Sequence, residues 1–341
     1  MFSQQSIFTK NNFKWMVLFL LLLITFFSSL FMGRYTISPE NTFIVLVNAL
    51  QGNIAQDMNS SIILGMRLPR TILSMLLGAG LAIAGSTYQG IFRNPLVSPD
   101  VLGVSSGAGF GSVLGILLFG MSATTSILAF VFGLGSVFLT YLFARARGQT
   151  TMMSLVLSGM IVSAIFAALI SLVKYVADPY DTLPAITYWL MGSFSKATFE
   201  DLRYIFIPLT ASLAVLNLVR WRINILSLGE EESKSLGVNP TRIKFIAIIA
   251  STVLTALSVT VVGIVGWVGL VIPHITRLLF GVDHKVLLPA SCLIGAIFLT
   301  VVDIVSRSVI SAEIPIGIIT ALLGAPFFGF LLKYTNQKGD W

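Results

Sequence analysis

Charged residues are scarce in this sequence. Asp, Glu, Lys and Arg make up 10% of its 341 residues, whereas hydrophobic residues make up 56%. A soluble domain carries roughly one quarter charged residues, so this composition excludes an ordinary soluble protein. It indicates an integral membrane protein instead.

Reactive and metal-binding side chains are also rare. The single cysteine, Cys292, excludes an internal disulfide framework and a thiolate metal site. The two histidines, His274 and His284, lack the spaced partners of a zinc site. No glycine is followed by lysine, so the phosphate-binding pattern G-x-x-x-x-G-K-[ST] is missing. We therefore expect no bound metal, no cofactor and no catalytic residue in this chain.

The net charge of +7 raises the question of nucleic-acid binding. A nucleic-acid surface is typically a basic stripe interleaved with aromatic residues, and this sequence has no such stripe. Its Lys and Arg residues flank apolar runs instead. We attribute the charge to membrane topology and expect no nucleic-acid partner.

Uncharged apolar stretches predict about ten membrane spans, because a helix needs roughly 20 apolar residues to cross the bilayer. The expected spans are Trp15–Gly33, Thr71–Phe92, two within 101–144 joined by a turn at 120–126, Gly148–Val173, Tyr204–Val219, two within 245–276 divided near 263–269, Val286–Val302 and Ile314–Leu332. The predicted fold class is an all-α integral membrane protein, in which residues 1–341 form one polytopic transmembrane domain.

The basic residues predict the orientation of these spans. If the first span is retained and the N-terminus lies inside, about twice as many Lys and Arg residues fall on the cytoplasmic side as outside, as the positive-inside rule requires. Both termini and residues 223–240 are then cytoplasmic. Outside, Ser38 and Pro39 begin and Gly52 ends a short surface helix. A second outer segment, 178–197, is expected to pack back against the bundle.

Residues 223–240, INILSLGEEESKSLGVNP, are a polar segment in an apolar sequence. Ser227 followed by Glu230 fits a capping box at the start of a helix, and Gly237 fits a helix end. Acidic residues in a first turn are stabilised by the positive end of the helix dipole. The segment therefore predicts a short, separate helix on the cytoplasmic side.

One acidic residue, Asp303, lies near the middle of an apolar stretch, where ionisable residues are rare and often functional. Arg307 follows four residues later on the same helical face, which favours a structural ion pair. The alternative is an ion-coupled secondary transporter in which Asp303 is the titrating group.

Five motifs in a fixed order resemble the permease subunits of ATP-binding-cassette (ABC) importers for iron–siderophore complexes, haem and vitamin B12. The motifs are RLPR (67–70), GAGLAIAGSTYQGIFRNPLVSPDVLGVSSGAGFG (78–111), LSLGEEESKSLGVN (226–239), GWVGLVIPHITRLLFGVDHKVLLP (266–289) and EIPIGIITALLGAPFFGFLL (313–332). The resemblance covers the chain from about 67 to 333.

This resemblance implies a set of partners and a location. A second permease copy or a paralogue would form the passage with this chain. Two ATPase subunits would bind ATP and Mg below it, and an extracytoplasmic binding protein would deliver the cargo from outside. The expected location is the bacterial cytoplasmic membrane, and iron–siderophore, haem and corrinoid cargoes are all compatible with the motifs.

The resemblance also implies roles for individual residues. The polar segment would be the coupling helix that contacts the ATPase, through Ser227, Gly229, Glu230, Glu231, Glu232, Leu236 and Gly237. The binding protein would dock on Arg67, Arg70 and Arg307. A carboxylate-bearing partner would explain arginines on the outer side, although arginine at a span's edge also commonly extends to the interface. The cytoplasmic gate would contain Asn94, Leu96, Met152 and Met153.

Overall fold

The computed structural model describes residues 2–53, 55–145 and 151–338 as helices joined by loops. The helices are α1 (Phe2–Phe31), α2 (Pro39–Leu50), α3 (Met58–Ser60), η1 (Ser61–Arg67), α4 (Leu68–Phe92), η2 (Pro99–Leu102), α5 (Val104–Phe119), α6 (Ala123–Ala144), α7 (Met152–Val176), α8 (Thr182–Leu190), α9 (Phe199–Leu228), α10 (Glu230–Ser235), α11 (Pro240–Val262), α12 (Val268–Phe280), α13 (His284–Ser308) and α14 (Ile316–Lys338). The predicted all-α membrane class is confirmed.

Within the described residues, seven helices are long and apolar enough to cross a membrane. Three shorter apolar helices accompany them, at Val104–Phe119, Val268–Phe280 and Ile316–Phe330. Every expected span thus has a helix at its position, although residues 148–150 of the fifth lie outside the described residues. The count of ten crossings stays a prediction, because the three short helices fall below the length of an ordinary span.

Two expected boundaries were wrong. The span expected at 204–219 belongs to α9, which continues to Leu228 because Arg220 and Arg222 end the apolar run without ending the helix. The span expected from Thr71 belongs to a continuous helical segment that begins at Met58. In each case a basic residue marked the end of the apolar run. The helix extends beyond that residue because its backbone hydrogen bonds do not depend on the hydrophobicity of the side chains.

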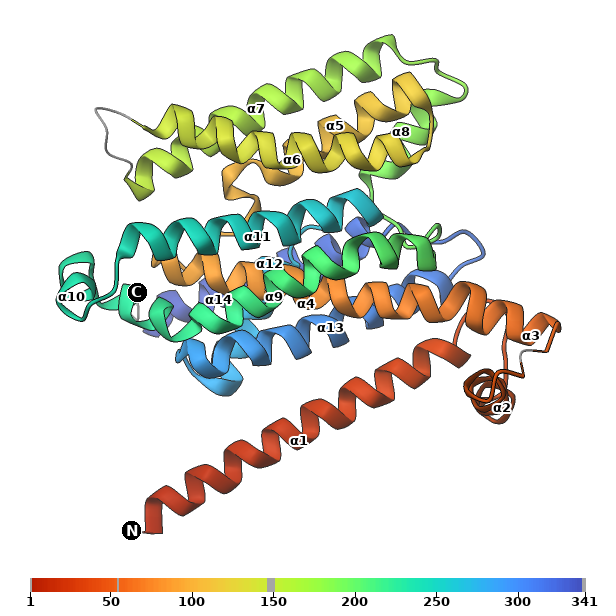
Figure 1. Cartoon of the computed structure of the whole chain (residues 1–341), viewed down its shortest axis with the longest axis horizontal. Helices are drawn as coiled ribbons and strands as arrows, with labels where there is room; N and C mark the ends of the chain where they lie inside the picture. The colour runs from red at the N-terminus through yellow and green to blue at the C-terminus, as the bar shows by residue number, and fades with distance from the viewer. Residues whose placement is uncertain (1, 54, 146–150, 339–341) are drawn as a thin grey trace.

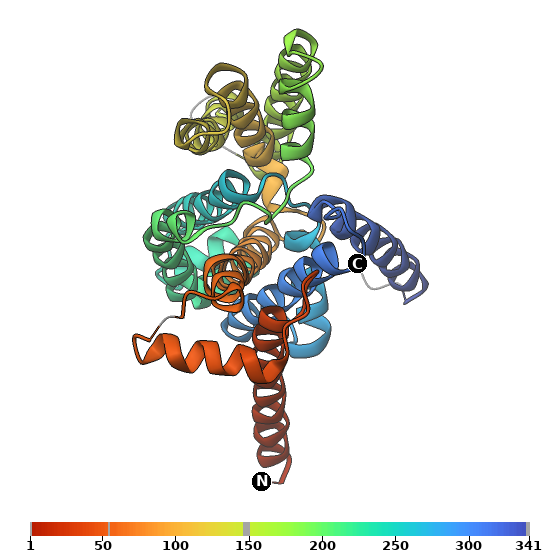
Figure 2. The same ribbon diagram turned by 90° about the vertical axis from the view of Figure 1, so that its right-hand side faces the viewer.

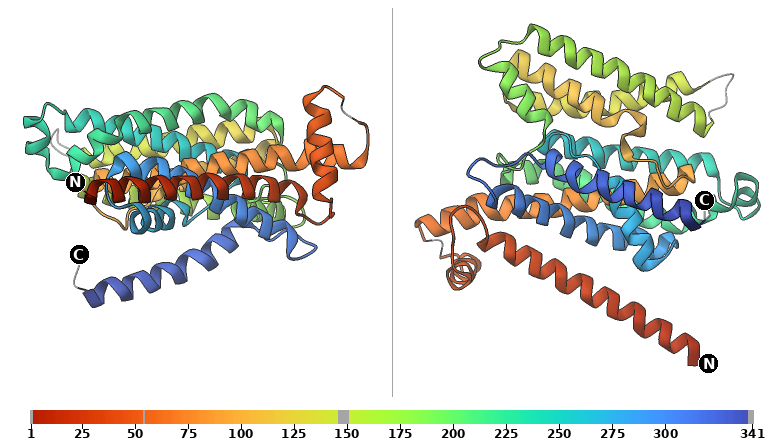
Figure 3. Two further views of the ribbon diagram at one scale, coloured as in Figure 1. Left: turned by 90° about the horizontal axis from the view of Figure 1, so that it is seen from below. Right: turned by 180° about the vertical axis from the view of Figure 1, so that it is seen from behind.

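The long helices run roughly parallel, and the two ends of the bundle differ (Figure 1). Helix α10 projects at one end, where α1 begins and α14 ends, and α2 lies at the other end (Figures 1 and 3). Helices α5 to α8 form a layer on one side, α4 runs through the middle, and α1 lies on the opposite side (Figure 2).

Helix α2 confirms the short helix predicted between Ser38 and Gly52, and its place on the outer side stays a prediction. The Ser38 hydroxyl accepts a hydrogen bond from Asn41 N at 3.2 Å, and Gly52 follows the helix with a φ of +78°. The helix lies across the end of the bundle, perpendicular to the long helices (Figure 2). Val45 is buried beneath it, and Phe43 is 64% exposed. Such a two-faced helix is typical of a membrane surface.

Helix α4 is the most enclosed of the long helices, with 78% of its apolar window buried. Its neighbours approach closely at glycines. A Cβ atom on Gly78 would lie 2.3 Å from Gly295 O, and one on Gly85 would lie 1.8 Å from Gly269 O. Small residues permit such contacts between helices in lipid, where hydrophobicity alone drives little association.

Helices α5 and α6 make a similar contact. Cβ atoms on Gly107, Gly111 and Gly115 would each lie within 2.7 Å of α6 atoms. These glycines share one face of α5, as their four-residue spacing indicates. On α7 the close contact is at Gly159, where a Cβ would lie 2.0 Å from Val101 O.

We predict that Gly85→Ala lowers the free energy of unfolding by about 1–3 kcal/mol, the usual cost of overpacking. The added methyl group would force α4 away from the α12 backbone at Gly269. The matched control is Gly135→Ala in α6, where a Cβ would meet nothing within 4 Å. The measurement is the melting temperature of the detergent-purified variants. Equal melting temperatures for the two variants would contradict the close approach.

Candidate functional site

Helix α10 is attached to the end of α9 by a glycine and a serine. Gly229 has a φ of +147°, and a Cβ there would collide with the Glu232 carboxylate. The Ser233 hydroxyl donates hydrogen bonds to Gly229 O and, at 3.0 Å, to Ile225 O. Gly229 O belongs to the first turn of α10 and also accepts from Ser233 N at 3.1 Å. Ile225 O is one of the carbonyls that lack a partner within α9, so the bond from the Ser233 hydroxyl to Ile225 O holds α10 against α9.

The sequence-based start of this helix was wrong. Ser227 lies in the last turn of α9 and donates to Asn224 O at 2.6 Å, so it caps nothing in α10. Gly229 occupies the capping position without a side-chain bond. A serine three residues before a glutamate also occurs inside a longer helix, where its hydroxyl bonds backwards. The predicted end is confirmed, because Gly237 follows with a φ of +77°.

The outward surface of α10 combines acidic and apolar side chains. Glu231 and Glu232 are exposed, as are Leu228 at 62% and Leu236 at 57% on either side of the helix. Lys244 of α11 donates a hydrogen bond to Glu230 and lowers the pKa of that carboxyl below its ordinary value. The Glu230 carboxylate therefore stays ionised at neutral pH. The two leucines beside the helix are left exposed by the described residues.

The end of α4 and the start of α7, next to which the expected gate residues lie in the sequence, are at the same end of the bundle as α10 (Figure 1). Asn94 and Leu96 are in the loop between α4 and η2, where Asn94 Oδ1 accepts from Leu96 N at 2.9 Å. Leu96 is 42% exposed, and Met153 at the start of α7 is 68% exposed. Met152 is partly buried against a cluster that includes Val97 of the same loop. The start of α7 and this loop thus contribute to the same hydrophobic cluster.

At the α2 end, Arg70 is paired with two carboxylates. Its Nε lies 2.8 Å from Asp303 Oδ1. Its Nη1 and Nη2 donate to the two oxygens of Glu313 at 2.8 and 2.9 Å, in the paired geometry that suits a guanidinium. Glu313 precedes α14, so the pairing joins α4, α13 and the start of α14.

The other two arginines are also paired within the chain. Arg307 Nε lies 3.3 Å from Asp303 Oδ2, which confirms the expected ion pair, and its Nη2 donates to Ser29 O at 2.7 Å. Arg67 Nη1 donates to Leu30 O at 2.8 Å. These bonds fasten the end of α1 to the end of η1 and to α13.

The three arginines expected to dock the binding protein are therefore buried. Arg67, Arg70 and Arg307 are 5%, 8% and 7% exposed. Their guanidinium groups bind partners within this chain, so none of the three offers a free surface in this conformation. Glu313 was absent from the sequence-based site. Its pairing spans 243 residues, a separation that one sequence cannot indicate.

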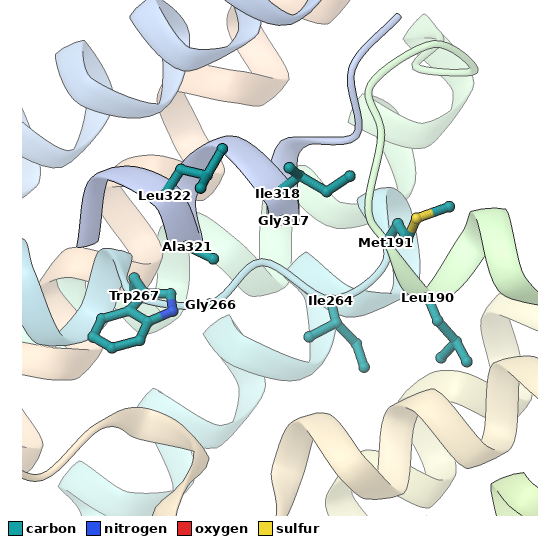
Figure 4. Close-up of a pocket in the computed structure, with 9 residues that line it drawn as sticks. All are labelled: Leu190, Met191, Ile264, Gly266, Trp267, Gly317, Ile318, Ala321 and Leu322. Atoms are coloured by element: carbon teal, nitrogen blue, oxygen red, sulfur yellow. The ribbon is translucent and has the colours of Figure 1, made fainter. Parts of the chain in front are cut away.

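An apolar groove of about 510 Å³ opens between α8, the break before α12, and α14. Its lining includes Leu190, Ile264, Trp267 and Leu322 and contains no charged residue (Figure 4). Trp267 has a φ of +70°, an uncommon conformation for a residue with a side chain. Backbone groups at the break form hydrogen bonds within the protein, as membrane-embedded backbone requires. For example, Ser193 N donates to Val262 O at 2.8 Å.

A family model described as the FecCD transport family matches residues 21–334. The chain belongs to this family. It is 43% identical over 325 residues to the molybdate import system permease protein MolB of Haemophilus influenzae, which covers 94% of this chain and 95% of that one. It is also 43% identical to an iron chelatin transport system permease protein of Helicobacter pylori, over 81% of this chain and 84% of the relative.

A solved structure gives the same FecCD-type fold. A metal-chelate type ABC transporter in an inward-facing conformation superposes with a TM-score of 0.84 and 42% identity, covering 94% of this chain and 98% of that chain. The family recognised from the five motifs is thereby confirmed, and the multi-pass membrane architecture with it.

We predict that Asp303→Ala lowers the free energy of unfolding by about 3–5 kcal/mol, because it leaves buried guanidinium groups without their carboxylate. The matched control is Asp181→Ala, since the exposed Asp181 makes no capping bond to α8. Melting temperatures of the purified variants are the measurement. Should both variants melt like the wild type, the Asp303 pairs would not stabilise the fold.

Proposed function

We propose that this chain, an ABC importer permease subunit of the FecCD family, is driven by ATPase subunits that contact α10. The observation that carries the proposal is the surface of α10. Three glutamates and two exposed leucines project at one end of the bundle. The chain is poor in charge, and the three glutamates lie outside its membrane-spanning segments. Acidic residues beside exposed leucines are typical of a protein interface with an apolar centre and a charged rim.

The full importer in this proposal contains two permease chains, either two copies or this chain and a paralogue. Two ATPase subunits bind ATP and Mg on the α10 side, and this chain carries no catalytic residue or cofactor. The α10 end then faces the cytoplasm of a bacterium, with both chain termini, and the α2 end faces outward. Support comes from the FecCD family match and from the metal-chelate transporter structure.

An extracytoplasmic binding protein docks on the α2 end in this proposal. For Arg70 to take part, a carboxylate of the binding protein must replace Glu313, which is the more exposed of its two partners at 30%. Arg67 and Arg307 would have to release the end of α1. The exposed side chains of α2 offer a contact that needs no rearrangement.

The passage opens and closes at the α10 end, where Asn94, Leu96, Met152 and Met153 form the proposed gate. The cargo is a small metal-containing species, for which an iron–siderophore complex is the first candidate. The relatives that import molybdate and iron chelatin support this class. The uncharged groove beside Trp267 suits a passage that makes few specific contacts with its cargo.

Asp303 does not support a proton-coupled transporter. A proton carrier must exchange its proton, but Asp303 is fully buried and lies between Arg70 and Arg307. Its two carboxylate oxygens lie 2.8 Å from Arg70 Nε and 3.3 Å from Arg307 Nε. Its role in the proposed importer is structural.

The test is uptake into proteoliposomes that contain this chain, its ATPase and its binding protein. Ferric citrate, molybdate and cobalamin are supplied in separate arms. We expect ATP-dependent uptake of one cargo, and a decrease of about tenfold in the triple variant Glu230→Ala, Glu231→Ala, Glu232→Ala, since a loss of roughly 1.4 kcal/mol in ATPase association gives that factor.

The control removes charge at the other end of the bundle, by Asp181→Ala with Glu200→Ala, two exposed residues at the starts of α8 and α9. This double variant is expected to retain uptake. Uptake by the chain alone under a proton gradient, unaffected by the triple substitution, would contradict the proposal.

A further inference from the structure

The last turn of α9 is bonded to the segment that begins the gate loop. Arg93 Nε and Nη2 donate to Leu226 O at 3.0 and 2.6 Å. Leu226 O is one of the carbonyls left without a helical partner at the end of α9. A charged donor makes a strong hydrogen bond to such a group. The exit of α4 is thus attached directly to the turn that leads into α10.

Arg93 also determines how the chain leaves α4. It has a φ of +50° and a ψ of 37°, a left-handed conformation that residues other than glycine rarely adopt. Asn94 and the rest of the gate loop follow immediately. A rare conformation persists where surrounding contacts hold it, and the two bonds to Leu226 O are contacts of this kind.

A second attachment joins the same turn of α9 to the start of α13. Asn224 Oδ1 accepts from His284 N at 2.8 Å and lies 2.8 Å from His284 Nδ1. Asn224 Nδ2 donates to Asp283 Oδ1 at 2.5 Å. Asp283 also caps α13, since it accepts from Lys285 N at 2.9 Å. One side chain of α9 therefore holds both the cap and the first amide of α13.

We propose that Arg93 and Asn224 are positioning residues that transmit a displacement of α10 along two separate branches, Arg93 to the gate loop and Asn224 to the start of α13. Helix α10 moves with the end of α9 because the Ser233 hydroxyl of α10 bonds to Ile225 O of α9. The inference rests on the proposed function, in which an ATPase displaces α10.

The two branches can be separated by experiment because each ends at an exposed residue. Leu96 in the gate loop is 42% exposed, and Val282 beside the start of α13 is 74% exposed. In a Cys292→Ser background, Leu96→Cys or Val282→Cys supplies one thiol for a maleimide. The rate of labelling is measured in the assembled importer, with and without a non-hydrolysable ATP analogue.

In each parent we expect the nucleotide to change the labelling rate by about tenfold, as a shift between two conformations allows. Arg93→Met, which keeps a long side chain without its donors, abolishes the response at position 96 and preserves it at 282. Asn224→Ala abolishes the response at position 282 and preserves it at 96. Arg93→Lys, which can still donate to Leu226 O, restores part of the response at 96.

Two controls test whether the effect is local. Arg242→Met changes an exposed arginine at the start of α11, and Asn12→Ala changes an exposed asparagine of α1. Both are expected to leave both responses intact. ATPase co-purification and melting temperature are measured for every variant, so that a general loss of folding is recognised.

The inference is overturned if Arg93→Met and Asn224→Ala respond like their parents. It is also overturned if each variant loses both responses and its melting temperature falls, since that pattern indicates a purely structural role. A parent that binds no ATPase or shows no nucleotide response contradicts the proposed function as well. Failure of the inference alone leaves the responses of the parents intact.

Discussion

The close approach of neighbouring backbones to α4 is the constraint on which the rest of this structure depends. Gly78 and Gly85 allow α13 and α12 to lie against it at distances that any side chain would prevent. Helices in a bilayer gain little from hydrophobicity when they associate, so this packing must supply the attraction. Helix α4 consequently forms a fixed axis, with Arg70 near one end and Arg93 at the other.

The charges at the two ends of this axis are arranged differently. At the α2 end one group of charges is buried, in which Asp303 is shared between Arg70 and Arg307. Buried charges cost free energy unless they are paired, so this arrangement holds α1, α4 and α13 in one geometry. At the α10 end the carboxylates face solvent, where they are available to a partner. The first arrangement is suited to rigidity and the second to association.

Local sequence signals predicted much of the fold. The start of α2 at Ser38, the end of α10 at Gly237 and the break near 263–269 all follow from residues that act on their immediate neighbours. Ser227 shows the limit of such signals, because the same capping pattern fits the interior of α9. Tertiary contacts decided between the two, as they commonly do.

The contacts that connect the proposed sites could not be read from the sequence. Arg93 and Leu226 are 133 residues apart, and Arg70 and Glu313 are 243 apart. Hydrophobic periodicity locates helices but does not identify which helices are neighbours. The burial of the arginines that the sequence predicted as docking residues follows from such distant pairings, which explains why the sequence indicated a free surface there.

The central claim is that α10 is the contact between this chain and an ATPase. The most direct measurement places a photoreactive benzophenone amino acid at position 231 in α10, or at position 43 in α2, within the assembled importer. We predict a cross-linked product with the ATPase subunit from position 231 and none from position 43. A product from position 43, or none from position 231 in an importer that retains its ATPase, would contradict the claim.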